Sequence, residues 1–206
     1  MICNIEILQK LFPSVLFSTN YRGIHLTFDD GPHPIATPQT LEILRKRDIH
    51  ATFFLLGKNV ERHPEIAQKI NAEGHQIGNH SYSHNTMFFK KKSWVQKEIQ
   101  QTEEILESTV GKHSCGFRPP YGYFDFTTLK VIAESGLKCI LWSADSKDWK
   151  SGTSASIEHR VLRRMQNGSI LLFHNNQHTE DRLHIYLPTI LDTLLGNGFI
   201  FNTLPL

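Results

Sequence analysis

Cysteine is scarce in this sequence and is not arranged for metal binding. The three cysteines, Cys3, Cys115 and Cys139, are odd in number and far apart, and no CxxC pair occurs. This spacing argues against a cysteine zinc cluster and against a disulfide framework. Cys139 lies in an apolar run, so we expect it to act as a small core residue.

An excess of charge of one sign is also lacking. The 206 residues include 22 Lys and Arg against 20 Asp and Glu, a net charge of +2. Electrostatics therefore give no reason to expect a nucleic-acid partner. The one basic run, Lys90 to Lys92, is interpreted as a solvated loop.

Long apolar runs are absent as well. No stretch approaches the roughly 20 apolar residues that cross a bilayer, so no membrane span is expected. The first twenty residues lack a basic n-region and a small-x-small cleavage site, and Lys10 and Pro13 interrupt their apolar stretch. No signal peptide is predicted, and the chain as written is expected in the cytoplasm, with a removed leader left open.

The composition, 39% hydrophobic and 20% charged, is that of a globular protein of one domain, and we expect a monomer.

A short apolar strand, a polar loop and an amphipathic helix recur along the chain. The predicted strands are residues 24–28, 52–56, 75–78, 139–142, 169–173 and 199–202, with a shorter one near Phe117. The helix signals are Thr37-Pro38 as N-cap and first residue, Pro64 as a first residue, a Ser93/Gln96 capping box, patterns that end at Gly136 and Gly168, and residues 188–195.

About seven such β–α units predict an α/β fold, either a parallel (β/α) barrel, complete or incomplete, or an open doubly wound sheet. The unusual polar residues gather where predicted strands end: Asp29 and Asp30, His80 and His84, residues 118–122, residues 145–149, and His174. The carboxyl ends of the strands of a parallel barrel share one face, where active sites form. This convergence predicts a single site.

Two of these groups predict a metal site. Neighbouring strand residues point in opposite directions, so Asp29 and Asp30 can serve different purposes, one facing substrate and one binding a metal. His80 and His84, with one carboxylate, complete three N/O ligands and leave positions open for water and substrate. The alternative for Asp29 and Asp30 is a role in a turn, because the sequence Asp-Gly-Pro is typical of turns. The alternative for His80 and His84 is a pair of histidines in a surface loop.

The remaining groups predict acid–base and oxyanion chemistry. His174 ends an apolar run and suits proton donation near neutral pH, or is a hydrogen-bonded rim histidine. Residues 118–122 (RPPYG) form a stiff loop that can present a peptide N–H to an oxyanion and aim Arg118 at a carboxylate, or act as a rigid connector. Residues 145–149 (DSKDW) supply carboxylates that could pair with Arg118 and, in Trp149, an aromatic ring for a sugar, or form a capped loop with a buried tryptophan.

Five segments resemble, in order and spacing, the motifs of the polysaccharide deacetylases, the carbohydrate esterases with a nodulation-type (NodB) domain. They are TFDDGP at 27–32, HSYSH at 80–84, RPPYG at 118–122, DSKDW at 145–149 and LFH at 172–174. The resemblance covers residues 22–206, and it leaves residues 1–21 as an N-terminal extension that packs on the barrel. It implies a single-domain distorted (β/α) barrel and one divalent metal ion, for which zinc is expected and cobalt, iron or manganese would also fit the ligands.

The resemblance also implies a role for individual residues. It gives Asp29 as the catalytic base, His174 as the catalytic acid, and Asp30, His80 and His84 as the metal ligands. Tyr121 matches the residue whose backbone N–H helps the oxyanion hole, and Leu172 matches an apolar contact to the acetyl methyl. Arg118 and Asp148 match the pair that orients the base.

The implied reaction is removal of N-acetyl groups from the N-acetylhexosamines of a glycan, with peptidoglycan, chitin-like oligomers and exported N-acetylglucosamine polymers all open. Such substrates lie outside the membrane, which conflicts with the absence of a visible leader. O-acetyl ester or small-amide hydrolysis, a vestigial glycan-binding protein and a phosphodiesterase are the alternatives. Two departures bear on the site: Asn175 stands where many members have an acidic residue, and the polar stretch 176–184 overhangs His174.

Overall fold

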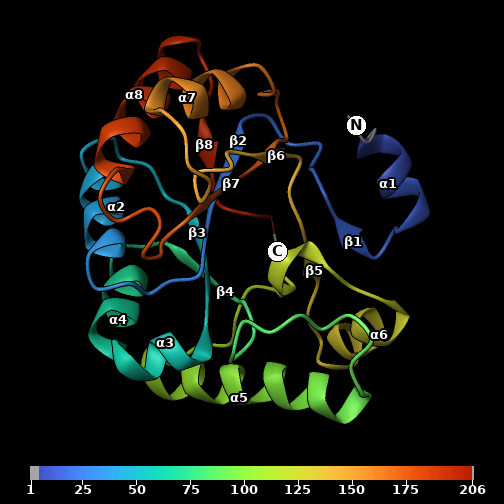
Figure 1. Cartoon of the computed structure of the whole chain (residues 1–206). Helices are drawn as coiled ribbons and strands as arrows, with labels where there is room; N and C mark the ends of the chain where they lie inside the picture. The colour runs from blue at the N-terminus through green and yellow to red at the C-terminus, as the bar shows by residue number, and fades with distance from the viewer. Residues whose placement is uncertain (1–4, 206) are drawn as a thin grey trace.

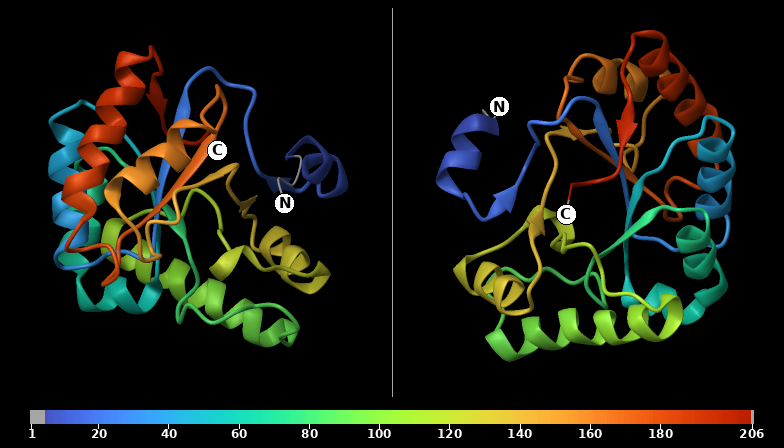
Figure 2. Two further views of the ribbon diagram at one scale, coloured as in Figure 1. Left: turned by 45° about the horizontal axis from the view of Figure 1, so that its top comes forward. Right: turned by 180° about the vertical axis from the view of Figure 1, so that it is seen from behind.

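The computed structural model describes residues 5–205 of the chain, and in it parallel strands surround a core with helices outside them (Figures 1 and 2). The strands are β1 (Val15–Leu16), β2 (Ile24–Asp29), β3 (Thr52–Leu55), β4 (Gln76–Asn79), β5 (Cys139–Ile140), β6 (Ala144–Asp145), β7 (Ile170–His174) and β8 (Phe201–Asn202). The helices are α1 (Ile5–Leu11), α2 (Ala36–Arg45), α3 (Gly57–Arg62), α4 (Pro64–Ala72), α5 (Lys92–Val110), α6 (Phe126–Glu134), α7 (Ser154–Leu162) and α8 (Leu183–Gly196), with a 3₁₀ turn, η1, at Pro120–Gly122.

The strands form a distorted, incompletely bonded barrel. One sheet has the order β4-β3-β2-β7-β6, with β8 paired to the first residues of β2, and β1 pairs with β5. Every one of these pairings is parallel. Single bridges from Phe117 to Asn79 and to Cys139 connect β4 with β5, and a bridge from Ser18 to Ser169 leads back towards β7. The predicted α/β fold with a distorted parallel barrel is therefore confirmed.

Alternation along the strands divides the core. On β7, Leu171 and Phe173 face α8, while Ile170, Leu172 and His174 point to the other side, since successive strand residues alternate. Stacked rings continue the outer layer: Phe173 lies 5.9 Å from Phe28 on β2 and 5.9 Å from Tyr186 on α8. Burying these rings between strands and helices adds to the apolar stabilisation of this half of the barrel.

The first residues contribute to the second part of the core. Leu8 on α1 and Phe12 pack on the cluster around β1, β5, α5 and α6, which includes Val15 and the buried Cys139. Residues 1–4 of the predicted extension and Leu206 of the predicted domain lie outside the described residues. No helix in residues 5–205 has both the length and the apolar character needed to cross a bilayer.

Several predicted element boundaries were wrong. Helix α2 begins at Ala36, because the Thr37 hydroxyl accepts the N–H of His33 in the preceding turn and does not cap the helix. Helix α5 begins at Lys92, with Lys91 at the N-cap, so the Ser93/Gln96 capping box does not mark its start. Helix α8 begins at Leu183 and includes Pro188.

The strand predicted at residues 139–142 was also wrong in extent. The chain pairs with β1 at Cys139–Ile140, leaves the ladder, and pairs again with β7 at Ala144–Asp145. The bend separates these two short strands and directs the following loop, with Asp148, towards His174. Pro64 does open α4, as predicted.

Candidate active site

The polar residues singled out in the sequence meet at one end of the barrel. Asp29 ends β2 and lies in register with His174 at the end of β7, and Asn79, at the end of β4, precedes His80. Arg118 follows the bridge residue Phe117. The strand ends of a parallel barrel form one face, and this face carries the candidate site.

Arg118 and Asp29 form a buried ion pair. The Nη1 group of Arg118 donates to Asp29 Oδ1 at 2.7 Å and to Thr27 Oγ1 at 2.8 Å. The rest of the guanidinium donates to the carbonyls of Ile140 and Leu141, and its carbon lies 4.0 Å from the centre of the Phe54 ring. Arg118 is completely buried. A buried cation with this many partners fixes the Asp29 carboxylate in one orientation.

Asp30, His80 and His84 bring three ligand atoms together. Asp30 Oδ1 lies 3.5 Å from His80 Nε2 and 3.1 Å from His84 Nε2. His80 Nδ1 lies 2.7 Å from the carbonyl oxygen of Arg118, which can only accept, so Nδ1 carries the proton and Nε2 offers its lone pair. The three ligand atoms lie within 4.8 Å of one another.

The Asp30 carboxylate fits a cation. Its Oδ1 is buried and accepts no hydrogen bond with good geometry, an arrangement that a divalent ion would satisfy. Its Oδ2 accepts a hydrogen bond of 2.6 Å from Asn176 Nδ2. Burial alone would raise the pKa of Asp30, but His80, His84 and His174 hold it well below its usual range. The donor set of one carboxylate and two imidazoles fits zinc and its neighbours in the first transition series.

His174 and Asp148 form a second buried pair. His174 Nδ1 donates to Asp148 Oδ1 at 2.7 Å, and the backbone N–H of His174 donates to Asp148 Oδ2 at 3.0 Å. Burial alone would lower the pKa of His174, but the Asp148 carboxylate raises it to about 9. With Nδ1 held by Asp148, the second ring nitrogen of His174 can carry a transferable proton.

The expected pairing of Arg118 with Asp148 was wrong. The guanidinium bonds to Asp29, and Asp148 bonds to His174 and to the hydroxyl of Tyr186 at 3.1 Å. The geometry explains the error: Arg118 follows the strand position beside β4 and β5, whereas the loop after β6 passes over the end of β7. Arg182 fastens that loop by donating to the carbonyls of Asp148, Lys150 and Gly152.

The other predicted contacts surround these pairs. The Tyr121 ring lies 4.7 Å from the ring of His84 and is largely exposed. Leu172 shares the inner side of β7 with His174 and is buried. Of the two interpretations of Trp149, the alternative of a buried tryptophan does not hold, because Trp149 is 45% exposed and its ring lies against the Lys150 ammonium.

Backbone strain is concentrated at this end of the barrel. The site loops hold five residues other than glycine with positive φ: Asp30 (73°), Ser81 (70°), His84 (65°), Tyr121 (61°) and Lys147 (53°). Left-handed backbone is costly for such residues and persists where surrounding contacts enforce it, which is common at functional sites.

Sequence reasoning missed four residues that support the site. They are Thr27, Asn79, Asn176 and Tyr186. Asn79 is fully buried, and its side chain accepts the N–H of Ser81 and donates to the carbonyl of Ile99 and to Glu103. Its position one residue before His80, where a strand would end in a polar amide, was the available signal.

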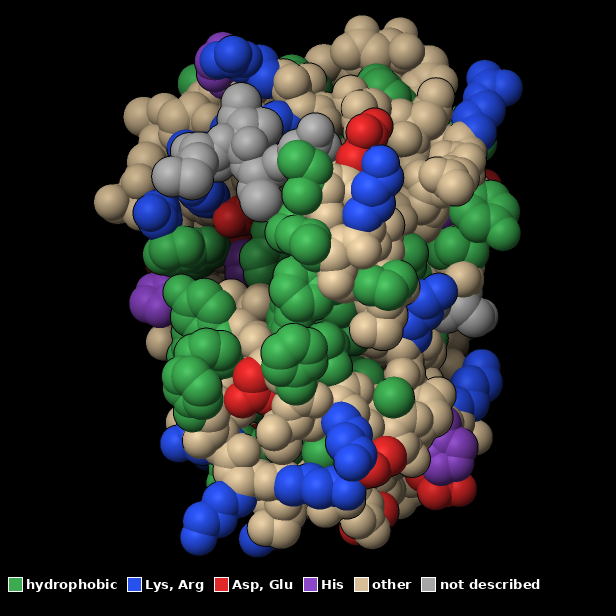
Figure 3. Space-filling model, turned by 90° about the vertical axis from the view of Figure 1, so that its right-hand side faces the viewer, with side chains coloured by type: hydrophobic (Ala, Val, Ile, Leu, Met, Phe, Trp, Pro, Cys, Tyr) green, Lys and Arg blue, Asp and Glu red, His purple; other side chains and the backbone are tan. Residues whose placement is uncertain are grey.

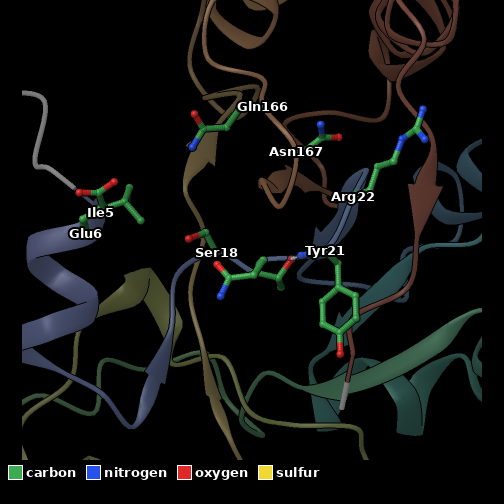
Figure 4. A pocket seen from close by; sticks show the side chains of 9 residues that line it. Ile5, Glu6, Ser18, Tyr21, Arg22, Gln166 and Asn167 are labelled. Carbon is green, nitrogen blue, oxygen red and sulfur yellow. Dashed lines mark hydrogen bonds between the residues drawn. The ribbon is translucent and has the colours of Figure 1, made fainter.

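A hollow lies between the barrel and the first residues of the chain, away from the site. This pocket of about 550 Å³ is lined by Ile5 and Glu6 of α1, residues 18–22, Gln166 and Asn167. Figure 4 shows Ile5 and Glu6 on one side of it and Asn167 and Arg22 on the other. None of the predicted site residues lines it.

The family model for polysaccharide deacetylases matches residues 18–140. A peptidoglycan-N-acetylglucosamine deacetylase of Bacillus cereus is 38% identical over 188 residues, which are 90% of this chain and 68% of that protein. A chitooligosaccharide deacetylase of Azorhizobium caulinodans is 35% identical, over 76% of this chain and 75% of that protein.

Solved structures agree in fold. The Bc1960 peptidoglycan N-acetylglucosamine deacetylase, in complex with an N-oxidanyl-benzamide, superimposes with a TM-score of 0.89 at 36% identity and covers 93% of this chain and 91% of its own. A Bacillus anthracis protein described as a carbohydrate esterase family 4 pseudoenzyme superimposes with a TM-score of 0.86 at 28% identity, covering 96% of this chain and 69% of its own. The predicted family is therefore confirmed: the chain belongs to the polysaccharide deacetylases, which are hydrolases acting on amide bonds.

Proposed function

We propose that the chain removes acetyl groups from the N-acetylglucosamine units of a glycan, using one divalent metal ion. The observation that carries the proposal is the convergence of Asp30 Oδ1 with Nε2 of His80 and His84. Beside these three atoms lie the Asp29 carboxylate, which is bonded to Arg118, and the His174 ring, which is bonded to Asp148. The group shared by the possible substrates is the acetamide at C2 of the sugar.

Asp29 is proposed as the base. Its Oδ1 is occupied by Arg118, so Oδ2, 3.7 Å from His80 Nε2, is the oxygen left to accept a proton. A divalent ion at Asp30, His80 and His84 would supply Lewis acidity to the acetyl carbonyl and to the attacking water. Asp29 takes a proton from that water as its oxygen bonds to the carbonyl carbon.

His174 is proposed as the acid. When the carbon–nitrogen bond breaks, the electron pair stays on the sugar nitrogen, which needs a proton in order to leave. His174 donates it from Nε2, and Asp148 stabilises the cation that exists before the transfer. The products are acetic acid, which ionises to acetate, and the free amine of the sugar, and the proton taken by Asp29 balances the one given by His174.

The remaining roles concern binding. The backbone N–H of Tyr121 is proposed to stabilise the oxyanion, Leu172 to contact the acetyl methyl, and Trp149 to contact a sugar ring. Fold alone does not decide that the site is active, since a protein described as a pseudoenzyme has a similar fold. Support for activity comes from the two complete pairs, Arg118–Asp29 and Asp148–His174.

Acetate release tests the proposal. The protein is incubated with chitooligosaccharides, with peptidoglycan and with an exported N-acetylglucosamine polymer, before and after chelation and after addition of zinc, cobalt, iron or manganese. We expect release from at least one glycan, loss on chelation and recovery with metal. Release that is unaffected by complete chelation would contradict metal dependence, and no release from any N-acetyl glycan with any metal would contradict the deacetylase.

A further inference from the structure

A tight turn ahead of α5 presents two phenylalanines to solvent. Its ends are closed by the hydrogen bond from Lys90 N to Met87 O at 3.1 Å, and Met87 is fully buried. The two central residues are Phe88, 43% exposed, and Phe89, 83% exposed, with their ring centres 4.1 Å apart. Phe89 has a φ of 59°, in the region that favours glycine or asparagine and is unusual for a bulky side chain. Nothing in the packing requires an aromatic ring there.

Asp125 fixes this turn against the start of α6. Its Oδ2 accepts the N–H of Phe89 at 2.9 Å, and its Oδ1 accepts the N–H and the hydroxyl of Thr128. The next residue, Phe126, is 85% exposed. Phe88, Phe89 and Phe126 therefore form one preformed apolar tip, which we call the phenylalanine tip. Figure 1 shows the segment that enters α5 beside the start of α6, at the lower right of the molecule.

Lysines surround the phenylalanine tip. Lys90, Lys91 and Lys92 follow directly and are exposed, and Lys130 is exposed one turn after Phe126 on α6. Of the acidic neighbours, Glu134 pairs with Lys92, and Asp125 is engaged with Thr128 and Phe89. Figure 3 shows hydrophobic side chains across the middle of the face that carries α1, β5 and α6, with Lys and Arg side chains along its lower edge.

This combination is that of a surface that binds anionic lipids. Exposed aromatic rings enter the boundary between headgroups and acyl chains, while neighbouring lysines remain at the level of the phosphates. A neutral glycan such as a chitooligosaccharide offers no charge to the lysines, whereas an anionic bilayer offers phosphates to the lysines and acyl chains to the rings. In a symmetric dimer built on this surface, each copy would place its lysines against those of the other.

We propose that the phenylalanine tip and Lys90–Lys91 dock the protein peripherally on the headgroup region of an anionic lipid bilayer. The Tyr121 ring lies 4.7 Å from the ring of His84 and 6.3 Å from that of Tyr123. Tyr123 precedes by two residues Asp125, which bonds to Phe89, so a short path leads from the metal-ligand set to the tip. Docking therefore brings the candidate active site close to the membrane surface. The proposal goes beyond the deacetylase function and does not depend on it.

Vesicle co-sedimentation tests the docking. We expect the protein to bind phosphatidylcholine vesicles that contain about one third phosphatidylglycerol, and to bind vesicles of pure phosphatidylcholine much more weakly. Replacing Lys90 and Lys91 with Gln should lower binding roughly 25-fold, since each lysine near an anionic surface contributes about fivefold. Lys46→Gln with Lys69→Gln, at exposed lysines directly after α2 and on α4, is the matched control and should not change binding.

Phe89→Asn separates docking from folding. Asparagine tolerates the backbone conformation of Phe89, so this variant should keep or raise the melting temperature while it lowers vesicle binding about tenfold. Ile185→Ser, at an exposed apolar position on α8, should bind as the wild type does. Equal vesicle binding by Phe89→Asn and wild type would overturn the proposal. So would a loss of binding to soluble chitooligosaccharide in Phe89→Asn without any change on vesicles, because it would assign the tip to glycan.

Discussion

Asp29 and Asp148 are buried carboxylates on the same face of the barrel, but they are paired with different cations. Asp29 bonds to Arg118, whose charge is permanent, and Asp148 bonds to His174, whose charge depends on pH. The first pair therefore keeps an anion ready to accept a proton. The second pair keeps a proton on a group that can release it.

Another buried histidine shows how much the carboxylate matters. The ring of His75, which directly precedes β4, lies 5.7 Å from the ring of His50. Burial and the nearby His50 lower the pKa of His75 to about 4. His174 is also buried, but beside Asp148 its pKa rises to about 9. Burial alone makes a histidine neutral, and a paired carboxylate reverses that outcome. The acid of the proposed mechanism is therefore set by Asp148.

The largest effect is expected from Asp29→Asn. The change keeps the shape of the side chain and its contact with Arg118 but removes the proton acceptor. Acetate release should fall by at least the roughly 10²–10⁴-fold contribution of general acid–base catalysis, while metal analysis should show unchanged occupancy. Asp145→Asn, at the end of β6, keeps its acceptor for the Lys147 N–H and is the control. Release near the wild-type rate in Asp29→Asn would make Asp29 a structural residue.

A selective effect is expected from His174→Ala. An amine leaving group needs a proton and an activated alkoxide or phenolate does not. The variant should therefore lose about 10²–10⁴-fold on an N-acetyl sugar and much less on an activated acetate ester. Asp29→Asn should lose both activities, because each substrate needs attack by water. If His174→Ala lost both activities equally, His174 would serve binding or structure.

A smaller effect is expected from Asn176→Ala. Asn176 donates to Asp30 Oδ2 at 2.6 Å and so holds Oδ1 towards His80 and His84. Contacts of this kind contribute about 10–100-fold to metal affinity. Competition with a chelator should show that loss for Asn176→Ala and no loss for Asn85→Ala, an exposed asparagine near His84. Unchanged affinity would mean that the Asp30 carboxylate keeps its orientation without Asn176.

The sequence predicted the parts of the site that depend on strand order. Asp29, His80 and His174 stand at strand ends, and a parallel barrel brings strand ends together whatever the detailed packing. Cross-chain partners could not be predicted in this way. Asp148 reaches His174 because the strand after Cys139 breaks and resumes at Ala144, and no local pattern marks that break.

Tertiary contacts also overrode the local helix signals. Thr37 has the chemistry of an N-cap, but its hydroxyl is used by His33 in the turn after Asp30, so α2 starts earlier. Asn176 lies in a polar stretch that resembles an ordinary loop, and its bond to Asp30 exists only because the loop after β7 lies over the end of β2. Such contacts depend on the relative placement of distant segments, which one sequence does not encode in a readable pattern.

The smallest effect, and the finest test of the two pairs, is expected from Asp148→Asn. Without the carboxylate, the pKa of His174 should fall from about 9, because only the charges of Asp30 and Asp29 then oppose the effect of burial. His174 must be protonated to donate, so the alkaline limb of the pH profile of kcat/KM should move to lower pH, while the acidic limb stays in place. At neutral pH the loss should be only several-fold, because a part of the imidazole remains protonated.

The same pair predicts a pH dependence of stability in the metal-free protein. The pKa of His174 is raised above its ordinary value of 6.5 in the folded state. Its contribution to the free energy of unfolding is therefore fully present below pH 6.5 and is lost as the pH rises through about 9. Urea unfolding of the metal-free wild type should show this loss, and Asp148→Asn should show little of it. Two results together would contradict this: the alkaline limb of the kcat/KM profile at the same pH in wild type and Asp148→Asn, and equal slopes of their unfolding free energy against pH. Asp148 would then orient His174 without setting its charge.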